Sequence, residues 1–163
     1  MKSKIMTNST QTTPDGKAVT IKKTFSRETA VSIKINADKA VIWALLTNAS
    51  DFSRWNSTII SIEGDIAQGE KIKLKAKLAP KRTFKIKIKE IVPEQKMVWG
   101  DGMGNRVFTL TEQGEGKVLF HMQEKIGNFM FPLFASQIPP FDDAFEQYAA
   151  DLKKEAETIV KTS

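Results

Sequence analysis

A long amphipathic stripe near the end of the chain constrains the fold more than any other feature of the sequence. Its apolar residues recur at spacings of three and four, the period of one helix face: Phe141, Phe145, Tyr148, Leu152, Ala156 and Ile159. Two prolines mark its start, and lysines lie toward its end. A helix over residues 140–160 would be about 30 Å long. Such a stripe needs a broad apolar surface to pack against.

The middle of the chain can supply that surface, because it alternates with period two. Residues 71–78 alternate Lys with Ile, Leu or Ala, and residues 84–89 alternate Phe or Ile with Lys. Each segment predicts a strand with one apolar and one cationic face, and the stretch around Pro80 predicts a hairpin between them. Further strands are predicted at residues 19–35 (broken near Arg27 and Glu28, or continuous), 58–62, 97–99, 106–111 and 117–126. Short helices are predicted after a cap at Asn36 and at residues 50–55.

This order of elements predicts an α+β protein in which a curved antiparallel sheet packs around the long helix. Five segments also resemble one known group of proteins: Ile35-Asn36-Ala37 leading to Ile42-Trp43, Asp51–Asn56, Arg106–Leu110, Gly114–Lys117 and Leu152–Glu157. In order and spacing they resemble the START/birch-pollen-allergen/polyketide-cyclase superfamily, whose architecture is the helix-grip fold. The resemblance covers roughly residues 30–160. Two departures are Ser57, where a proline often follows Trp-Asn, and Met122, where relatives often carry a histidine.

The resemblance implies a cavity between the sheet and the long helix that holds a hydrophobic small molecule. Some relatives are cyclases or dehydratases, and many are carriers or sensors, so fold likeness alone does not choose among these activities. Strand parity and the helix stripe give the residues expected to line the cavity: Trp55, Leu74, Phe84, Ile86, Trp99, Phe108, Leu110, Phe120, Met122, Glu124, Phe141, Phe145 and Tyr148. The same residue types also fill ordinary cores, and that interpretation stays open for each of them.

Three polar residues are candidates for chemistry. Glu124 shares the inward parity of Phe120 and Met122, and a register that pairs Phe108 with Met122 sets Arg106 opposite Glu124. Tyr148 adds a hydroxyl to the helix stripe. Together they could act as a polar anchor or as general acid and base, whereas a strand-end carboxylate that reaches solvent is the plain alternative.

Composition excludes several other classes of site. The chain has no cysteine and one histidine, His121. Disulfides, thiolate nucleophiles and zinc–thiolate sites are therefore excluded. No acidic cluster has calcium-loop spacing, and neither a nucleophile-elbow motif nor a dinucleotide fingerprint is present. We expect no metal and no cofactor. By strand parity His121 should point outward, as a surface histidine, unless a bulge intervenes.

The net charge of +6 is concentrated, since every charged residue from Lys71 to Lys89 is basic. No aromatic residue has outward parity there, so we expect a solvated face and no nucleic-acid partner. Weak docking of this face to an anionic membrane is the second interpretation.

No apolar run approaches the roughly 20 residues that span a bilayer. The polar start of the chain lacks the apolar stretch of a signal peptide. We expect residues 1–17 to be a flexible tail and residues 18–163 to be a single domain in the cytoplasm.

Three functions follow from these expectations. The first is the binding of a lipid- or polyketide-like molecule, and the second is a cyclase or dehydratase that uses Glu124, Arg106 and Tyr148. The third is a ligand-free interaction module similar to chaperone ATPase activators. An apolar cavity with isolated polar anchors favours binding, an inward Glu–Arg or Glu–Tyr arrangement in an open cavity favours the enzyme, and a filled core favours the module. The sequence does not predict the ligand or the oligomeric state.

Overall fold

The computed structural model describes residues 12–162. These residues form one antiparallel sheet with the strand order β1-β2-β8-β7-β6-β5-β4-β3. The strands are β1 (Ala18–Lys22), β2 (Ser26–Ile35), β3 (Ile59–Glu63), β4 (Lys71–Ala76), β5 (Phe84–Val92), β6 (Lys96–Gly100), β7 (Gly104–Glu112) and β8 (Val118–Gly127). The helices are α1 (Lys39–Thr47), α2 (Phe52–Trp55), α3 (Phe131–Phe134) and α4 (Asp142–Thr162), with 3-10 turns η1 (Ala49–Asp51) and η2 (Ala135–Gln137).

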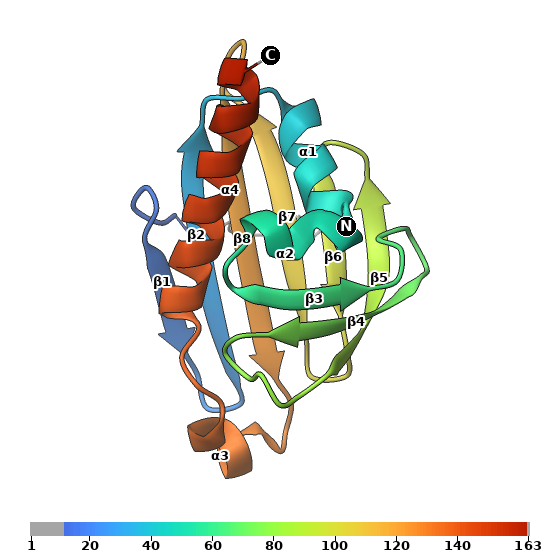
Figure 1. The fold of residues 1–163 in the computed structure, drawn as a ribbon. Helices are drawn as coiled ribbons and strands as arrows, with labels where there is room; N and C mark the ends of the chain where they lie inside the picture. Colours follow the sequence, from blue (N-terminus) through green and yellow to red (C-terminus); the bar gives the residue numbers. More distant parts are fainter. Residues whose placement is uncertain (1–11, 163) are drawn as a thin grey trace, which may run out of the picture.

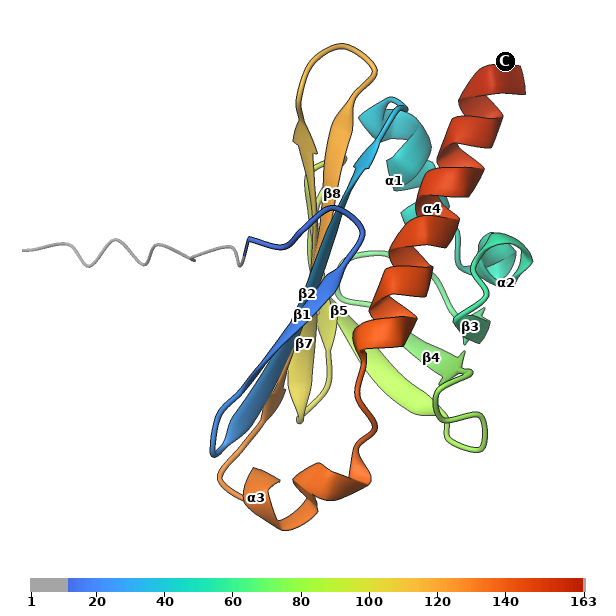
Figure 2. The same cartoon turned by 90° about the vertical axis from the view of Figure 1, so that its left-hand side faces the viewer.

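The long helix α4 lies along the concave face of the sheet (Figure 1). Seen edge-on, the sheet has α1, α2 and α4 on one side, and β3 and β4 curl toward α4 (Figure 2). The predicted α+β helix-grip architecture is confirmed. The core lies between α4 and the sheet.

The predicted stripe is the buried face of α4. Its buried residues are Phe145, Tyr148, Ala149, Leu152 and Ala156. Two acidic residues, Asp142 and Asp143, occupy the first turn, where the helix dipole favours negative charge. The helix begins at Asp142, two residues after Pro140, close to the start that the proline pair predicts.

The lysine-rich hairpin also forms as predicted. Strands β4 and β5 pair in a register that places Lys71 opposite Lys87 and Lys73 opposite Lys85, all four exposed. The apolar residues between them point the other way, and Ile72 and Leu74 are buried. The alternation therefore separates a cationic outer face from an apolar inner one.

Two local predictions are wrong. Helix α1 takes Asp38 as its N-cap, and the Asn36 side chain instead donates a hydrogen bond to Glu157 of α4. The break between the first two strands lies at residues 23–25, where the Lys23 amide bonds to the Ser26 carbonyl. Arg27 therefore lies inside β2, opposite Ile126 of β8.

The single histidine is not on the surface. His121 has the outward parity expected, since it pairs with Ser32 of β2 and Thr109 of β7, but it is only 6% exposed. The chain before β1 runs beside β2 at this point: the Thr13 hydroxyl lies 2.5 Å from that of Ser32, and the Gly16 amide bonds to the Ser32 carbonyl. Strand parity correctly predicted the face of the sheet on which His121 lies. It did not predict that the chain before β1 runs along that face. The rest of the predicted tail, residues 1–11, lies outside the described residues.

Candidate functional site

A cavity of about 550 Å³ lies between the sheet and the first half of α4. Strands β4 and β5 form one wall, β7 and β8 another, and the connection between α3 and α4 a third. Ten of the residues singled out from the sequence line it: Leu74, Phe84, Ile86, Trp99, Arg106, Met122, Glu124, Phe141, Phe145 and Tyr148. The end of α3 contributes Phe134, and the connection contributes Gln137, Ile138 and Pro139, none of which the sequence indicated.

Four residues expected to line the cavity lie in the filled core instead: Trp55, Phe108, Leu110 and Phe120. The reason is aromatic packing around Tyr148. The Phe120 ring stacks on the Tyr148 ring at 6.2 Å between centroids, and the Phe108 centroid lies 6.1 Å from it. Helix α2 brings Trp55 to 6.4 Å from the same ring. These rings fill the interface beyond Tyr148.

An ion pair lies on the cavity wall where the filled core ends. Arg106 of β7 stands opposite Glu124 of β8, the register expected from the sequence, and its Nε donates to Glu124 Oε1 at 3.1 Å. Both side chains are 17% exposed. The guanidinium also lies over the Phe145 ring, 4.9 Å from the centroid, a cation–π geometry. The wall therefore carries a charged pair held in place by α4.

A second arginine, which the sequence analysis did not single out, holds the segment that forms the third wall. Arg27 of β2 donates through Nη1 to the Ile138 carbonyl at 3.1 Å and through Nη2 to the Pro139 carbonyl at 2.8 Å. It lies over the Phe141 ring at 4.8 Å, and that ring stacks on Phe145 with centroids 6.0 Å apart. Burial lowers the pKa of Arg27, while Asp142 and Glu124 oppose that shift.

Arg27 therefore ties the connection before α4 to the sheet. A signal for it was present in the sequence, since Arg27 shares the inward parity of Val31 and Ile33. A charged residue at an inward position of an otherwise apolar strand indicates a buried polar contact.

Tyr148 places a buried hydroxyl at the inner end of the cavity. The residue is 1% exposed, and its hydroxyl has no hydrogen-bond partner among residues 12–162. Burial raises the pKa of Tyr148, and the nearby Arg106 opposes that shift only in part. The phenol therefore stays protonated at neutral pH and can donate a hydrogen bond. Leaving such a group unpaired costs about 1–3 kcal/mol.

Within the described range, no three His, Asp or Glu side chains are grouped so as to hold a metal ion. None of the helices in that range is both long and apolar enough to cross a membrane.

Several solved structures share this fold. The Zhui aromatase/cyclase from a Streptomyces species is 10% identical, with a TM-score of 0.67, and the match covers 83% of this chain and 96% of that one. A conserved protein of unknown function from Enterococcus faecalis is 17% identical, with a TM-score of 0.64, covering 87% and 78%. A START superfamily protein from Mycobacterium smegmatis is 12% identical, with a TM-score of 0.60, covering 81% and 98%.

At these identities the structural likenesses show the fold alone. No curated protein sequence matches the chain. A family model does match, over residues 36–157, from the residue after β2 to the last turns of α4. The START-like resemblance seen in the sequence is thereby confirmed. The chain belongs to the family described as activator of Hsp90 ATPase homolog 1-like protein.

Proposed function

We propose that this protein binds a hydrophobic or amphipathic small molecule, lipid- or polyketide-like, in the cavity between its sheet and α4. The observation that carries the proposal is the cavity itself. Its volume of about 550 Å³ is that of a small-molecule site, and its walls are mainly apolar with few polar groups.

The distribution of lining groups suggests how such a molecule would lie. Phe84 and Ile86 of β5 are half-buried and would contact its apolar body. Its polar end would lie near Arg106 and Tyr148. An oxygen acceptor there would satisfy the unpaired Tyr148 hydroxyl, and no bond within residues 12–162 engages the terminal nitrogens of Arg106. The ligand class with the best fit is therefore an apolar body that ends in a carbonyl, carboxylate or phenol oxygen.

A pair of matched substitutions on α4 tests the cavity. Ala144 lines it and is half-buried, whereas Ala150 lies on the exposed side of the same helix. Ala144→Trp should fill the cavity and weaken binding of the fluorescent probe anilinonaphthalene sulfonate on the order of tenfold or more, since the probe loses its apolar contacts. Ala150→Trp should leave probe affinity unchanged. Equal affinities in both variants would contradict the proposal.

Catalysis is the second candidate, and the observation that favours it is the inward Arg106–Glu124 pair in an open cavity. A polyketide-like substrate could displace Glu124 from Arg106, freeing the carboxylate to accept a proton while the Tyr148 hydroxyl donates to a carbonyl oxygen. Glu124→Gln separates the two functions. A binding role predicts weaker ligand affinity with the fold intact, whereas a catalytic role predicts intact affinity and loss of turnover of a cyclisable or dehydratable substrate.

The family's name supports a third candidate, activation of an Hsp90-type chaperone ATPase. The cavity favours the other two functions over this one, because an interaction module that binds no ligand needs no such cavity. The test is the ATPase rate of an Hsp90-type chaperone with and without the protein. An increase that Ala144→Trp leaves unchanged would favour the interaction module over the ligand-binding function.

A further inference from the structure

The end of the molecule beyond the cavity exposes four large apolar side chains. Phe129 is 81% exposed, Leu133 72%, Phe25 56% and Met130 43%. We call these four residues the apolar tip. They come from two connections: the β1–β2 turn, and the segment between β8 and α4 that contains α3. This second segment projects from one end of the fold (Figure 2). Clustered apolar exposure of this kind marks an interaction site.

The two connections that form the apolar tip are held together. Ser26 of β2 pairs with Gly127 of β8, directly beside Phe25 and Asn128. Gly127 has a φ of 151°, and a side chain there would collide with the Phe25 carbonyl. Only glycine permits this close approach, so the backbone brings Phe25 next to the segment that carries Phe129.

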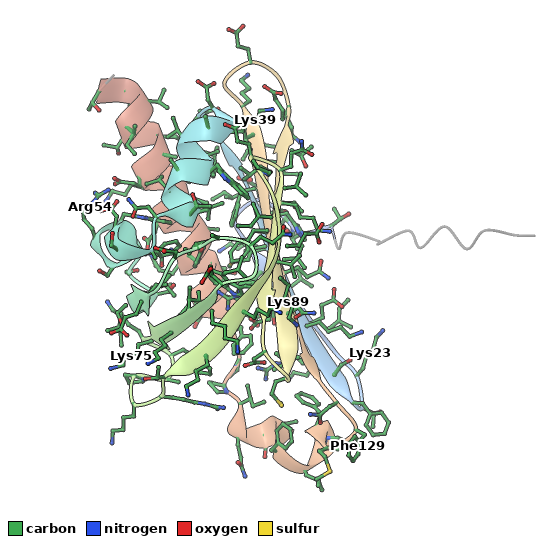
Figure 3. All side chains as sticks on the ribbon, turned by 90° about the vertical axis from the view of Figure 1, so that its right-hand side faces the viewer. Lys23, Lys39, Arg54, Lys75, Lys89 and Phe129 are labelled. Carbon is green, nitrogen blue, oxygen red and sulfur yellow. The ribbon has the colours of Figure 1, made fainter. Side chains whose placement is uncertain are left out.

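The charges around the apolar tip are mainly basic. Lys22, Lys23 and Lys125 flank it and are exposed, and from Lys125 to Phe141 there is no acidic residue. Figure 3 places Lys23 and Phe129 at the same end of the molecule, far from Lys39. The carboxylate of Asp101, in the adjacent β6–β7 turn, accepts hydrogen bonds from the Met103 and Gly104 amides.

We propose that the apolar tip docks on an anionic lipid bilayer, with Phe129 and Leu133 inserted among the acyl chains and the flanking lysines on the headgroups. Protruding apolar side chains with adjacent lysines match the physical requirements of an interfacial anchor. A second copy of the chain is a poorer occupant, because pairing two tips would bring Lys22, Lys23 and Lys125 of each copy together.

This docking site differs from the one expected from the sequence alone, the basic face of residues 71–89. That face carries lysines without exposed aromatic residues, and Leu78 is its one exposed large apolar side chain, so it offers attraction but little to insert. The apolar tip also adjoins the cavity, since the same connection supplies Phe134 and Ile138 to its wall. Docking here would bring that wall close to the membrane surface.

Co-sedimentation with vesicles tests the proposal, comparing phosphatidylcholine alone with a mixture containing phosphatidylserine. The wild-type protein should bind the mixed vesicles and bind the neutral ones much more weakly. The double variant Phe129→Ser/Leu133→Ser should bind the mixed vesicles on the order of tenfold more weakly. Lys22→Gln/Lys23→Gln should weaken binding on the order of tenfold at low salt. The control is Ile60→Ser/Val160→Ser, which removes two apolar side chains, each 38% exposed, from other parts of the surface and should bind like wild type.

Three results would overturn the proposal: no wild-type binding to the mixed vesicles at low salt, equal binding by the Phe129→Ser/Leu133→Ser variant, or binding lost only when Lys73, Lys75, Lys85 and Lys87 are changed to Gln. A wild-type dimer that Phe129→Ser/Leu133→Ser dissociates would assign the apolar tip to self-association instead. The Ala144→Trp variant should dock normally, so failure of docking and failure of the cavity proposal are separate outcomes.

Discussion

The two halves of the interface between α4 and the sheet differ although strands β7 and β8 run through both. In the half nearest the end of α4, Phe108, Phe120 and Leu152 are fully buried and the space is filled. In the half nearest its start, Phe84 and Ile86 remain half-buried around a cavity of about 550 Å³. We refer to these as the filled half and the hollow half.

Paired positions on β7 and β8 show where one half passes into the other. Moving toward the hollow half, Leu110 pairs with Phe120, Phe108 with Met122 and Arg106 with Glu124. Within four residues of each strand the inward side chains change from apolar to charged. A charged pair cannot be packed like aromatic rings without a large desolvation cost, so the space beside it stays open. The difference indicates that one half stabilises the fold and the other is available for a ligand.

The largest effect on the free energy of unfolding is expected when one phenylalanine from each half is replaced by alanine and the two losses are compared. Phe120→Ala should lower the free energy of unfolding by about 3–5 kcal/mol, because it leaves a void in close-packed surroundings. Phe84→Ala should cost only roughly 1–2 kcal/mol, because the half-buried ring already borders empty space. Chemical denaturation measures both. Equal losses would contradict the division into a filled and a hollow half.

The ion pair at the boundary should show the next largest effect. Arg106→Met leaves Glu124 without its partner and should cost about 1–3 kcal/mol in unfolding free energy. If that cost comes from the unpaired carboxylate, the double variant Arg106→Met/Glu124→Leu should lose less unfolding free energy than the two single variants lose in sum. Strict additivity in this cycle would mean that the two charges do not interact.

The hydroxyl of Tyr148 should have a smaller effect, and its removal should raise the free energy of unfolding rather than lower it. Tyr148→Phe removes a buried group that has no partner, and the small void left by the oxygen offsets part of the gain. The unliganded protein should therefore become more stable by about 1 kcal/mol, while probe affinity falls. A loss of stability would indicate that the hydroxyl makes a hydrogen bond in the unliganded protein.

The pH dependence gives a second measurement on the same residue. Burial raises the pKa of Tyr148 in the folded state, so below the ordinary tyrosine value near 10 both states are protonated and the phenol has no effect on stability. Above that pH the unfolded state ionises first, and stability falls as pH rises. This is the only tyrosine in the chain, so tyrosinate absorbance reports it alone. The absorbance should appear only as the protein unfolds, and the Tyr148→Phe variant should lose less stability in alkali. A native protein with tyrosinate absorbance near pH 10 would contradict the burial.

The smallest effect is expected on the outer face of the hollow half. Changing Lys73, Lys75, Lys85 and Lys87 to Gln should alter unfolding free energy by no more than about 0.5 kcal/mol per site, because all four are exposed. The change should raise the free energy of unfolding, because Lys73 and Lys85 stand directly opposite each other and their like charges repel. Probe binding should be unaffected. A marked loss of stability would mean that these side chains contribute to the fold.

The sequence predicted the elements and their apolar faces in both halves, but it did not separate the filled half from the hollow one. Period-two and three-four spacings report which face is apolar, and this was enough for the sheet, for α4 and for the Arg106–Glu124 register. Spacing does not report whether an inward side chain meets another side chain or a void. Phe108 and Phe84 have equivalent patterns, yet only Phe84 borders the cavity. Arg27 and the connection before α4 were missed because their contacts are to backbone carbonyls remote in sequence.

The most direct test of the central claim is an NMR titration of the isotope-labelled protein with dodecanoate, which has an apolar body and a carboxylate end. Shift changes should concentrate on residues that line the cavity, such as Ile86, Arg106 and Ala144, and should be lost in the Ala144→Trp variant. Residues of the filled half, such as Leu110 and Leu152, should change little. Changes centred on the filled half, or no saturable change anywhere, would contradict the claim that the hollow half is the binding site.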